Sequence, residues 1–439
     1  MQPRGLIEEW RIAVRTLVGV ARNRDSRFKL KPSAEVLSDG WVRALHRAGQ
    51  CVFLIALIAG LFLSACATPQ RMQPVPSADT TNAMPLGIPN AHFFPTIDLA
   101  GLTAEANQAL TRRRQVLGLT ADAQLPAAYF LAISGGGDNG AFGAGLLIGW
   151  AEAGDRPEFD YVTGVSTGAL IAPFAFLGPA YKKQLRDVYT TISADDVFKE
   201  RGFINGIFSD ALADTTPLWK LISRYVDEAM MENIAREYQK GRLLVIGTTD
   251  LDAERPVLWN IGAIAASGRP GSLDLVRKIL LASSAVPAYF PPVLIDVEVD
   301  GKSYQELHVD GGAFAQMFLY PPNMDLRKIV KQERKAYVIW NARLDPEWAD
   351  AEPRTLRIAG RAISTMIHSS GSNDLMGIYF ITQRDGVDYN LAYIGSDFSA
   401  PRAGDFDKSY MNALFDYAYQ QARRGYSWKK TPPMLAGSQ

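Results

Sequence analysis

The amino-acid sequence predicts an α/β fold in which helices cover both faces of a mainly parallel central sheet. Two observations lead to this prediction. Short apolar runs that suit buried strands alternate along the chain with longer segments whose apolar residues recur at helical spacing. The composition, with 47% apolar and 10% aromatic residues among 439, is typical of a globular protein with a large core.

The predicted elements follow one another from residue 129 onward. The first strand, 129–133, precedes a glycine-rich loop and a helix at 142–152 that ends near Gly154. Further strands are expected at 159–163, 243–247, 336–340 and 391–394, and further helices at 169–177, 272–284, 354–381 and 406–424. A β-hairpin is expected at 293–309, because Asp300-Gly301 supplies the positive φ angles of a tight turn.

The longest uncharged apolar run, 51–65, precedes this predicted fold and indicates export. It has about fifteen residues, fewer than the roughly 20 of a bilayer span, and it follows basic residues and ends in small ones, as a secretory signal does. Leu63-Ser64-Ala65-Cys66 resembles the bacterial lipobox, which implies cleavage before Cys66 and lipidation of its thiol; a plain signal peptide or an uncleaved membrane anchor is the alternative. The long segment before the run indicates either an extended leader or a downstream start.

The sequence therefore divides into four parts. They are a leader and signal peptide at 1–65, a tether and N-terminal extension at 66–125, the α/β domain at 126–345 and a mainly helical extension at 346–439. Ala67 after the lipidated cysteine, in place of Asp, indicates the outer membrane facing the periplasm. Lipid anchoring would hold the protein beside a membrane.

Charge and cysteine content exclude several classes of function. Basic and acidic residues are equal at 46 each, so no net field attracts nucleic acid. The only two cysteines, Cys51 and Cys66, precede the α/β domain, which excludes a disulfide framework or a cysteine-rich zinc site within it. Asp250 and Asp252 have no third ligand near them in sequence, and a turn after a strand explains them. No metal or cofactor is expected.

Three motifs carry candidate chemistry. Gly164-x-Ser166-x-Gly168 fits a nucleophile elbow, a tight strand-to-helix turn that exposes a serine hydroxyl. A glycine loop, Gly135-Gly136-Gly137, lies between a strand and a helix and favours an oxyanion hole. A phosphate-binding loop would need Gly-Lys-Ser/Thr at its end, and a dinucleotide-binding fingerprint would need an acidic residue at the end of the next strand; the sequence has neither. A purely structural turn is the remaining alternative. Asp310-Gly311-Gly312 presents a carboxylate at a strand end, or forms an ordinary Asp-Gly turn.

The three motifs, SGGGDNGAFGAG, GVSTG and HVDGG in this order, resemble those of the patatin-like phospholipase family, whose members hydrolyse acyl esters of lipids with a serine–aspartate dyad. The resemblance covers about 127–341. It implies a three-layer α/β/α sandwich, a membrane-lipid substrate, Ser166 as nucleophile, Asp310 as base and Gly135, Gly136 and Gly137 as the oxyanion loop. Asn139 departs from the family pattern, since many members carry Arg or Lys there.

Two other functions are compatible with the same residues. An α/β-hydrolase with a Ser166-Asp310-His368 triad has the required order along the chain. A lipid-binding lipoprotein without turnover is the second alternative, because Asn139 removes a cation from the glycine loop. The segment 195–214 is further predicted to form a lid over the acyl chains.

Overall fold

The computed structural model describes residues 71–200, 213–329, 331–345 and 353–435, which form one compact unit within Pro69–Gln439. The predicted leader, the signal peptide and Cys66 lie outside the described residues, as does most of the predicted lid. Among the residues that are described, no helix is long and apolar enough to span a bilayer.

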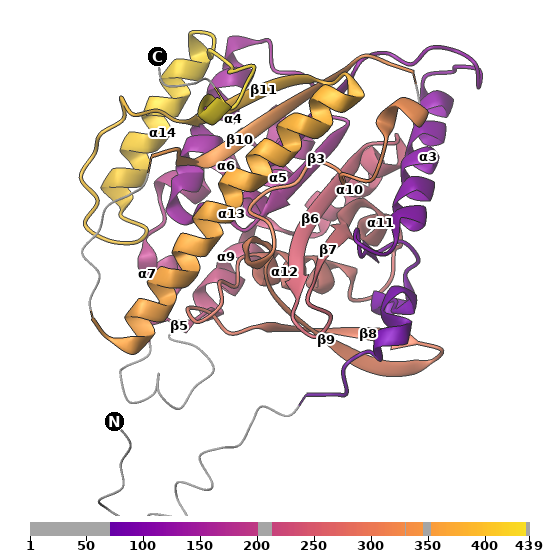
Figure 1. Ribbon diagram of the computed structural model, residues 1–439, viewed down its shortest axis with the longest axis horizontal. Coiled ribbons are helices and arrows are strands. Elements are labelled where there is room, and N and C mark those ends of the chain that lie inside the picture. The colour runs from indigo at the N-terminus through magenta and orange to yellow at the C-terminus, as the bar shows by residue number, and fades with distance from the viewer. Residues whose placement is uncertain (1–70, 201–212, 330, 346–352, 436–439) are drawn as a thin grey trace, which may run out of the picture. The chain divides into compact units, whose positions relative to one another are not determined.

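A twisted sheet forms the middle layer of the unit (Figure 1). Its strands run in the order β1 (His92–Phe93), β7 (Arg255–Asn260), β6 (Leu243–Asp250), β3 (Tyr161–Val165), β2 (Ala128–Ile133), β10 (Arg334–Arg343) and β11 (Asp388–Ile394). The five strands from β6 to β11 are parallel, whereas β1 and β7 are antiparallel to their neighbours. A hairpin of β8 (Val293–Val299) and β9 (Lys302–Asp310) joins the sheet where β9 pairs antiparallel with the end of β6.

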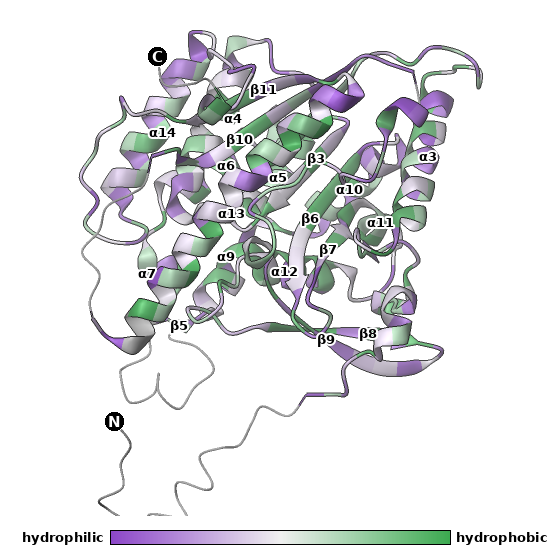
Figure 2. Cartoon of the chain, viewed as in Figure 1, coloured by the Kyte–Doolittle hydropathy of each residue, from purple (hydrophilic) through white to green (hydrophobic). Residues whose placement is uncertain are grey.

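Helices cover both faces because successive side chains of each strand point to opposite sides. Leu131 and Ile133 of β2 pack into one core, and Ala132 between them packs into a second core. The first core lies under α4 (Gly140–Ala153), α5 (Thr167–Leu177), α6 (Lys182–Thr190), α9 (Thr216–Tyr225), α10 (Glu228–Gln239), α11 (Ile261–Ala266), α12 (Ser272–Ser283) and α14 (Lys408–Arg423). The second lies under α13 (Thr355–Asp385) and α3 (Leu99–Val116). Figure 2 shows the hydrophobic central strands between these layers.

The C-terminal region is part of the same layered unit. β11 extends the sheet beyond β10, and α14 packs along α4. The glycines of α4 permit this packing, since a Cβ atom on Gly145 would lie 2.2 Å from the carbonyl oxygen of Phe415. Part of the glycine-rich stretch therefore serves helix packing and has no role in chemistry.

The predicted α/β/α sandwich with a mainly parallel sheet is confirmed. The predicted hairpin is also found, with φ of 49° at Asp300 and 74° at Gly301. Strand β7 and helices α3, α6, α9 and α10 were not predicted. The domain boundaries drawn from the sequence stay predictions, although α3 and β1 place folded structure in the N-terminal extension.

Candidate active site

Ser166 lies at the sharp turn between β3 and α5. Its backbone has φ 55° and ψ −125°, a strained conformation for a residue with a side chain. The turn is tight enough that a Cβ atom on Gly164 would lie 2.4 Å from the carbonyl oxygen of Gly168, and one on Gly168 would lie 2.2 Å from that of Ile133. Both positions of the predicted elbow therefore require glycine.

A second serine holds this turn from the opposite side. The backbone N–H of Ser166 donates to Ser283 Oγ at 3.0 Å, and the Ser283 hydroxyl donates to the carbonyl oxygen of Gly247 at 2.7 Å. Ser283, at the end of α12, thus links the elbow to the interior of β6. Its side chain is fully buried. None of the three sequence motifs includes Ser283, so the sequence did not predict its role.

Asp310 is the last residue of β9 and is buried, with 2% of its surface exposed. Its Oδ1 accepts a hydrogen bond of 2.7 Å from the backbone N–H of Gly312, while its buried Oδ2 has no hydrogen-bond partner among the described residues. Burial raises the pKa of Asp310 to about 7, and the nearby Ser166 hydroxyl and the Gly312 amide moderate the rise. The two predicted catalytic residues, which are distant in sequence, therefore come together.

The glycine loop between β2 and α4 lies beside Ser166. A Cβ atom on Gly135 would lie 3.1 Å from the Ser166 Cβ, and one on Gly136, whose φ is 153°, would lie 2.1 Å from the carbonyl oxygen of Asn341. The Gly135 N–H already donates to the carbonyl oxygen of Gln316 at 3.0 Å. The amides of Gly136 and Gly137 have no such acceptor in the described part of the chain, so these two remain as candidate oxyanion donors.

Polar residues of β10 and α14 support this loop. Asn341 donates through its side-chain amide to the carbonyl oxygen of Ser134 at 2.9 Å and accepts from the N–H of Gly143 at 3.0 Å. The Tyr410 hydroxyl donates to Asn139 Oδ1 at 2.7 Å. Asn139 is therefore part of the packing between the loop and α14.

A guanidinium also lies next to the loop, although position 139 carries no cation. Arg402 forms an ion pair of 2.9 Å with Asp138, whose carboxylate is buried. Burial raises the pKa of Asp138, and the Arg402 charge opposes this rise. Both residues line the same cavity as Ser166. The positive charge that the sequence seemed to lack near the loop is thus present in the C-terminal region.

Ser166 and Asp310 open into one cavity of about 1530 Å³ that both apolar and basic residues line. The apolar residues of the lining include Leu170, Val188, Ile192, Val197, Phe198, Leu218, Leu221, Val286 and Phe290. The polar and basic residues include Arg343, Arg354, Arg361, Arg402, Ser364 and His368. The cavity therefore suits an amphipathic ligand with a long apolar part.

His368 lines this cavity from α13. In a triad its imidazole would be hydrogen-bonded to Ser166 and Asp310, but its partner in the structure is a backbone carbonyl group. Its Nε2 lies 3.3 Å from the carbonyl oxygen of Arg343, and its ring lies 6.2 Å from that of Trp340. Among the described residues it forms no hydrogen bond with Ser166 or Asp310.

An α/β/α sandwich with a serine on a strand-to-helix elbow, beside a buried carboxyl group and a glycine loop, has the site architecture of a serine acyl hydrolase. Residues 131–321 match the family of patatin-like phospholipases. This part of the chain is a patatin-like phospholipase domain, as the resemblance of its motifs predicts.

The chain is also similar to mammalian phospholipases. It is 27% identical over 194 residues to calcium-independent phospholipase A2-gamma of Rattus norvegicus and to that of Mus musculus. The aligned part covers 42% of this chain and 24% of each relative, so the chain spans about a quarter of their length.

Two solved structures show a weak similarity. VipD from Legionella pneumophila is 12% identical, with 68% of this chain and 67% of that chain covered and a TM-score of 0.31. The type III effector protein ExoU is 14% identical, with 69% and 54% covered and a TM-score of 0.25.

Proposed function

We propose that this protein hydrolyses fatty-acyl esters of lipids, phospholipids among them, with Ser166 as nucleophile and Asp310 as general base. The observation that carries the proposal is the unpartnered buried Oδ2 of Asp310, in the same cavity as a serine held on a strained elbow. The patatin-like domain and the amphipathic cavity support a lipid acyl ester as the substrate class.

In the first half-reaction, Asp310 accepts the hydroxyl proton of Ser166 as its oxygen attacks the ester carbonyl carbon. The carbonyl oxygen becomes negatively charged in the tetrahedral intermediate, and the Gly136 and Gly137 amides supply hydrogen bonds to it. The intermediate collapses when the alcohol leaves with the proton held by Asp310. The acyl group then remains on Ser166.

In the second half-reaction, water takes the place of the alcohol. Asp310 accepts a proton from the water molecule while the water oxygen attacks the carbonyl carbon of the acyl-enzyme. Asp310 then donates this proton to the Ser166 oxygen as the fatty acid leaves. A carboxyl group with a pKa near 7 suits both steps, because it is ionised in part of the population and yet basic enough to accept a proton.

The test is hydrolysis of p-nitrophenyl acyl esters and of a mixed phospholipid bilayer, with products identified by mass spectrometry. Ser166→Ala is expected to lower the rate by at least about 10³-fold while the protein stays folded. Ser409→Ala, an exposed serine at the start of α14, is the matched control and keeps full activity. A folded wild-type protein that is inert toward every acyl ester would contradict the proposal and support the lipid-binding alternative.

We also propose that Cys66 carries a lipid anchor that holds the domain at the outer membrane facing the periplasm. The lipobox-like residues before Cys66 and the Pro-rich tether after it support this localisation. Metabolic labelling with a radioactive fatty acid is expected to mark the wild-type chain and not Cys66→Ala. Labelling that survives this substitution would contradict the anchor.

A further inference from the structure

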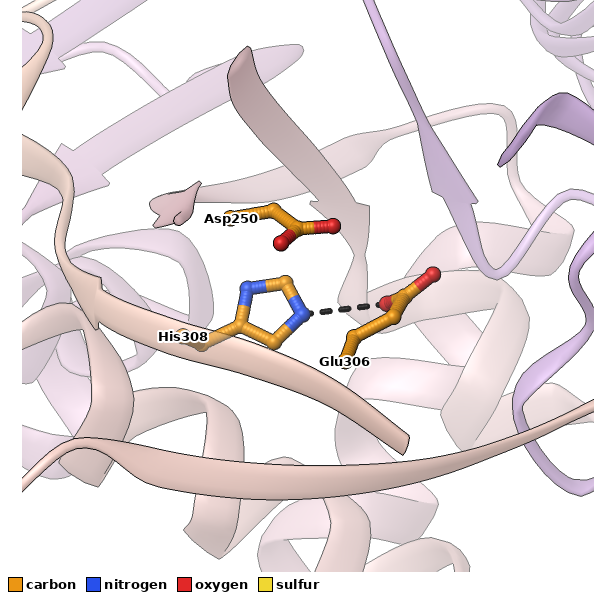
Figure 3. A group of neighbouring side chains, drawn as sticks. All are labelled: Asp250, Glu306 and His308. Carbon is orange, nitrogen blue, oxygen red and sulfur yellow. Dashed lines mark hydrogen bonds and ion pairs between the residues drawn. The ribbon is translucent and has the colours of Figure 1, made fainter. Parts of the chain in front are cut away.

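A second group of buried polar side chains lies where β9 pairs with the end of β6, outside the cavity that contains Ser166. Asp250 of β6 and Glu306 and His308 of β9 point toward one another, with ligand-type atoms that all lie within 4.8 Å (Figure 3). The exposed fractions of these three residues are 3%, 1% and 0%. None of the three lines the cavity that contains Ser166.

The separations suit ligands of one metal ion. His308 Nε2 lies 3.0 Å from Glu306 Oε2, and adjacent ligand atoms on a tetrahedral Zn²⁺ ion with bonds near 2.0–2.1 Å are about 3.3 Å apart. The Asp250 carboxylate, which lies within 4.8 Å of both, completes a set of one imidazole and two carboxylates. Such nitrogen and oxygen donors suit divalent first-row metals.

The charges of the buried carboxylates also favour a bound metal ion. Two carboxylates are buried within 4.8 Å of each other, and no lysine or arginine of the described residues forms an ion pair with Asp250 or Glu306. The imidazoles of His92 and His308 are the partners of Glu306 in this part of the chain, and a divalent cation would add the positive charge that neutral imidazoles do not supply to two carboxylates.

Neighbouring groups hold each ligand as the surroundings of metal sites do. His308 Nδ1 lies 3.0 Å from the Thr248 hydroxyl, which accepts a 2.7 Å hydrogen bond from the indole N–H of Trp259. Asp250 Oδ1 accepts from two backbone amides, those of residues 252 and 253. The second oxygen of Glu306 lies 3.2 Å from His92 Nε2 of β1.

We propose that Asp250, Glu306 and His308 bind one divalent metal ion of the Zn²⁺ or Mn²⁺ class. The ion would crosslink β6 and β9 directly before Asp310, which follows His308 by two residues on the same strand. Its role is structural, since the site lies outside the cavity. It would tie the strand that presents Asp310 to the sheet.

The test is metal content of the untagged full chain with Cys51→Ser and Cys66→Ser, so that thiols do not bind the metal. After incubation with Zn²⁺ or Mn²⁺ and dialysis, elemental analysis is expected to give about one ion per chain, and chelation is expected to lower Tm by several degrees. Asp252→Asn is the matched control, because its carboxylate is partly exposed and pairs with Arg71 instead of the cluster. It keeps the ion.

His308→Gln is expected to reduce the retained metal to less than about one-tenth per folded chain. If this variant does not fold, Asp250→Asn provides the same measurement. The wild-type tautomer of His308 gives an independent readout by ¹⁵N NMR: a metal-bound Nε2 carries no proton, whereas a metal-free cluster has Nε2–H donating to Glu306. A wild-type protein that retains neither metal, or that retains it equally in these variants, would overturn the proposal.

Discussion

Asp310 and Glu306 are two buried carboxyl groups on the same strand, four residues apart, with opposite electrostatics. Both oxygens of Glu306 lie within 3.2 Å of an imidazole nitrogen, and the two imidazoles bring its pKa down to about 2 despite the burial. Asp310 accepts one backbone amide on Oδ1 and faces the Ser166 hydroxyl, and burial raises its pKa to about 7 in spite of both. Burial alone therefore does not decide the charge of a carboxyl group; its partners do.

The difference in partners suits Glu306 to a structural role and Asp310 to proton transfer. A carboxylate with a partner on each oxygen stabilises the strands around it and has little tendency to take a proton. A carboxyl group that is left without a partner costs stability and is available for proton transfer. The alternation of a strand places both on one side of β9, so the same strand serves both purposes.

The largest expected effects come from removing the charge of each of these two carboxyl groups. Asp310→Asn removes the proposed base and is expected to lower the rate of acyl-ester hydrolysis by about 10⁴-fold, with unchanged or increased stability near neutral pH. Glu306→Gln removes the charge between two imidazoles and is expected to lower the free energy of unfolding by about 3 kcal/mol. Enzyme assays and thermal unfolding of both variants test the contrast. Loss of stability in Asp310→Asn without loss of activity would contradict it.

The pH dependence sharpens the comparison further. The pKa of Asp310 is about 7 in the folded protein against 3.8 for the unperturbed group, so between these values the folded chain keeps a proton that the unfolded chain has lost. Stability from this group is therefore complete below pH 4 and decreases as pH rises to 7, by roughly 4 kcal/mol in total. The hydrolysis rate is expected to change in the opposite direction, rising through pH 7 to a plateau.

Chemical denaturation across this pH range measures the effect. Subtracting the curve of Asp310→Asn isolates this group from all other titrating residues. Identical pH dependence in the wild type and the variant would show that Asp310 titrates normally, and its assignment as the base would lose its electrostatic support.

A smaller loss of activity is expected from Gly136→Ala. The new Cβ atom would lie 2.1 Å from the carbonyl oxygen of Asn341, at a φ of 153° that residues with a side chain rarely adopt. The loop must shift, which moves the amides of Gly136 and Gly137 and lowers the rate by about 10²–10³-fold. Gly404→Ala, where no atom lies within 4 Å of the added Cβ, is the control. Equal activity of both variants would exclude these amides from the oxyanion hole.

The sequence predicted the parts of the site that depend on local backbone geometry. The elbow around Ser166 and the strand end at Asp310 are visible because tight turns require glycine at fixed spacing. The strands of the sheet and its hairpin could be predicted because apolar periodicity and an Asp-Gly turn are also features of short, continuous segments. The predicted roles in catalysis remain predictions.

The rest of the site depends on contacts between remote segments. Ser283 reaches the elbow from α12, and Gln316 takes the amide of Gly135, which the sequence had counted among the oxyanion donors. Asp250 seemed to lack a third metal ligand because Glu306 and His308 follow it by more than fifty residues. No spacing rule along one chain identifies such contacts.

The smallest effect is expected at His368, which decides between a dyad and a triad. In a triad its imidazole would accept the Ser166 proton, and His368→Ala would lower the rate by several orders of magnitude. In the structure His368 Nε2 lies beside the carbonyl oxygen of Arg343, whereas the buried Asp310 carboxyl group faces the Ser166 hydroxyl. We therefore expect His368→Ala to change kcat by less than about threefold, with a shift in KM because the ring lines the cavity. Steady-state kinetics with a p-nitrophenyl ester measure both constants, and a loss of kcat comparable to that of Asp310→Asn would establish the triad and reduce Asp310 to the group that orients an imidazole.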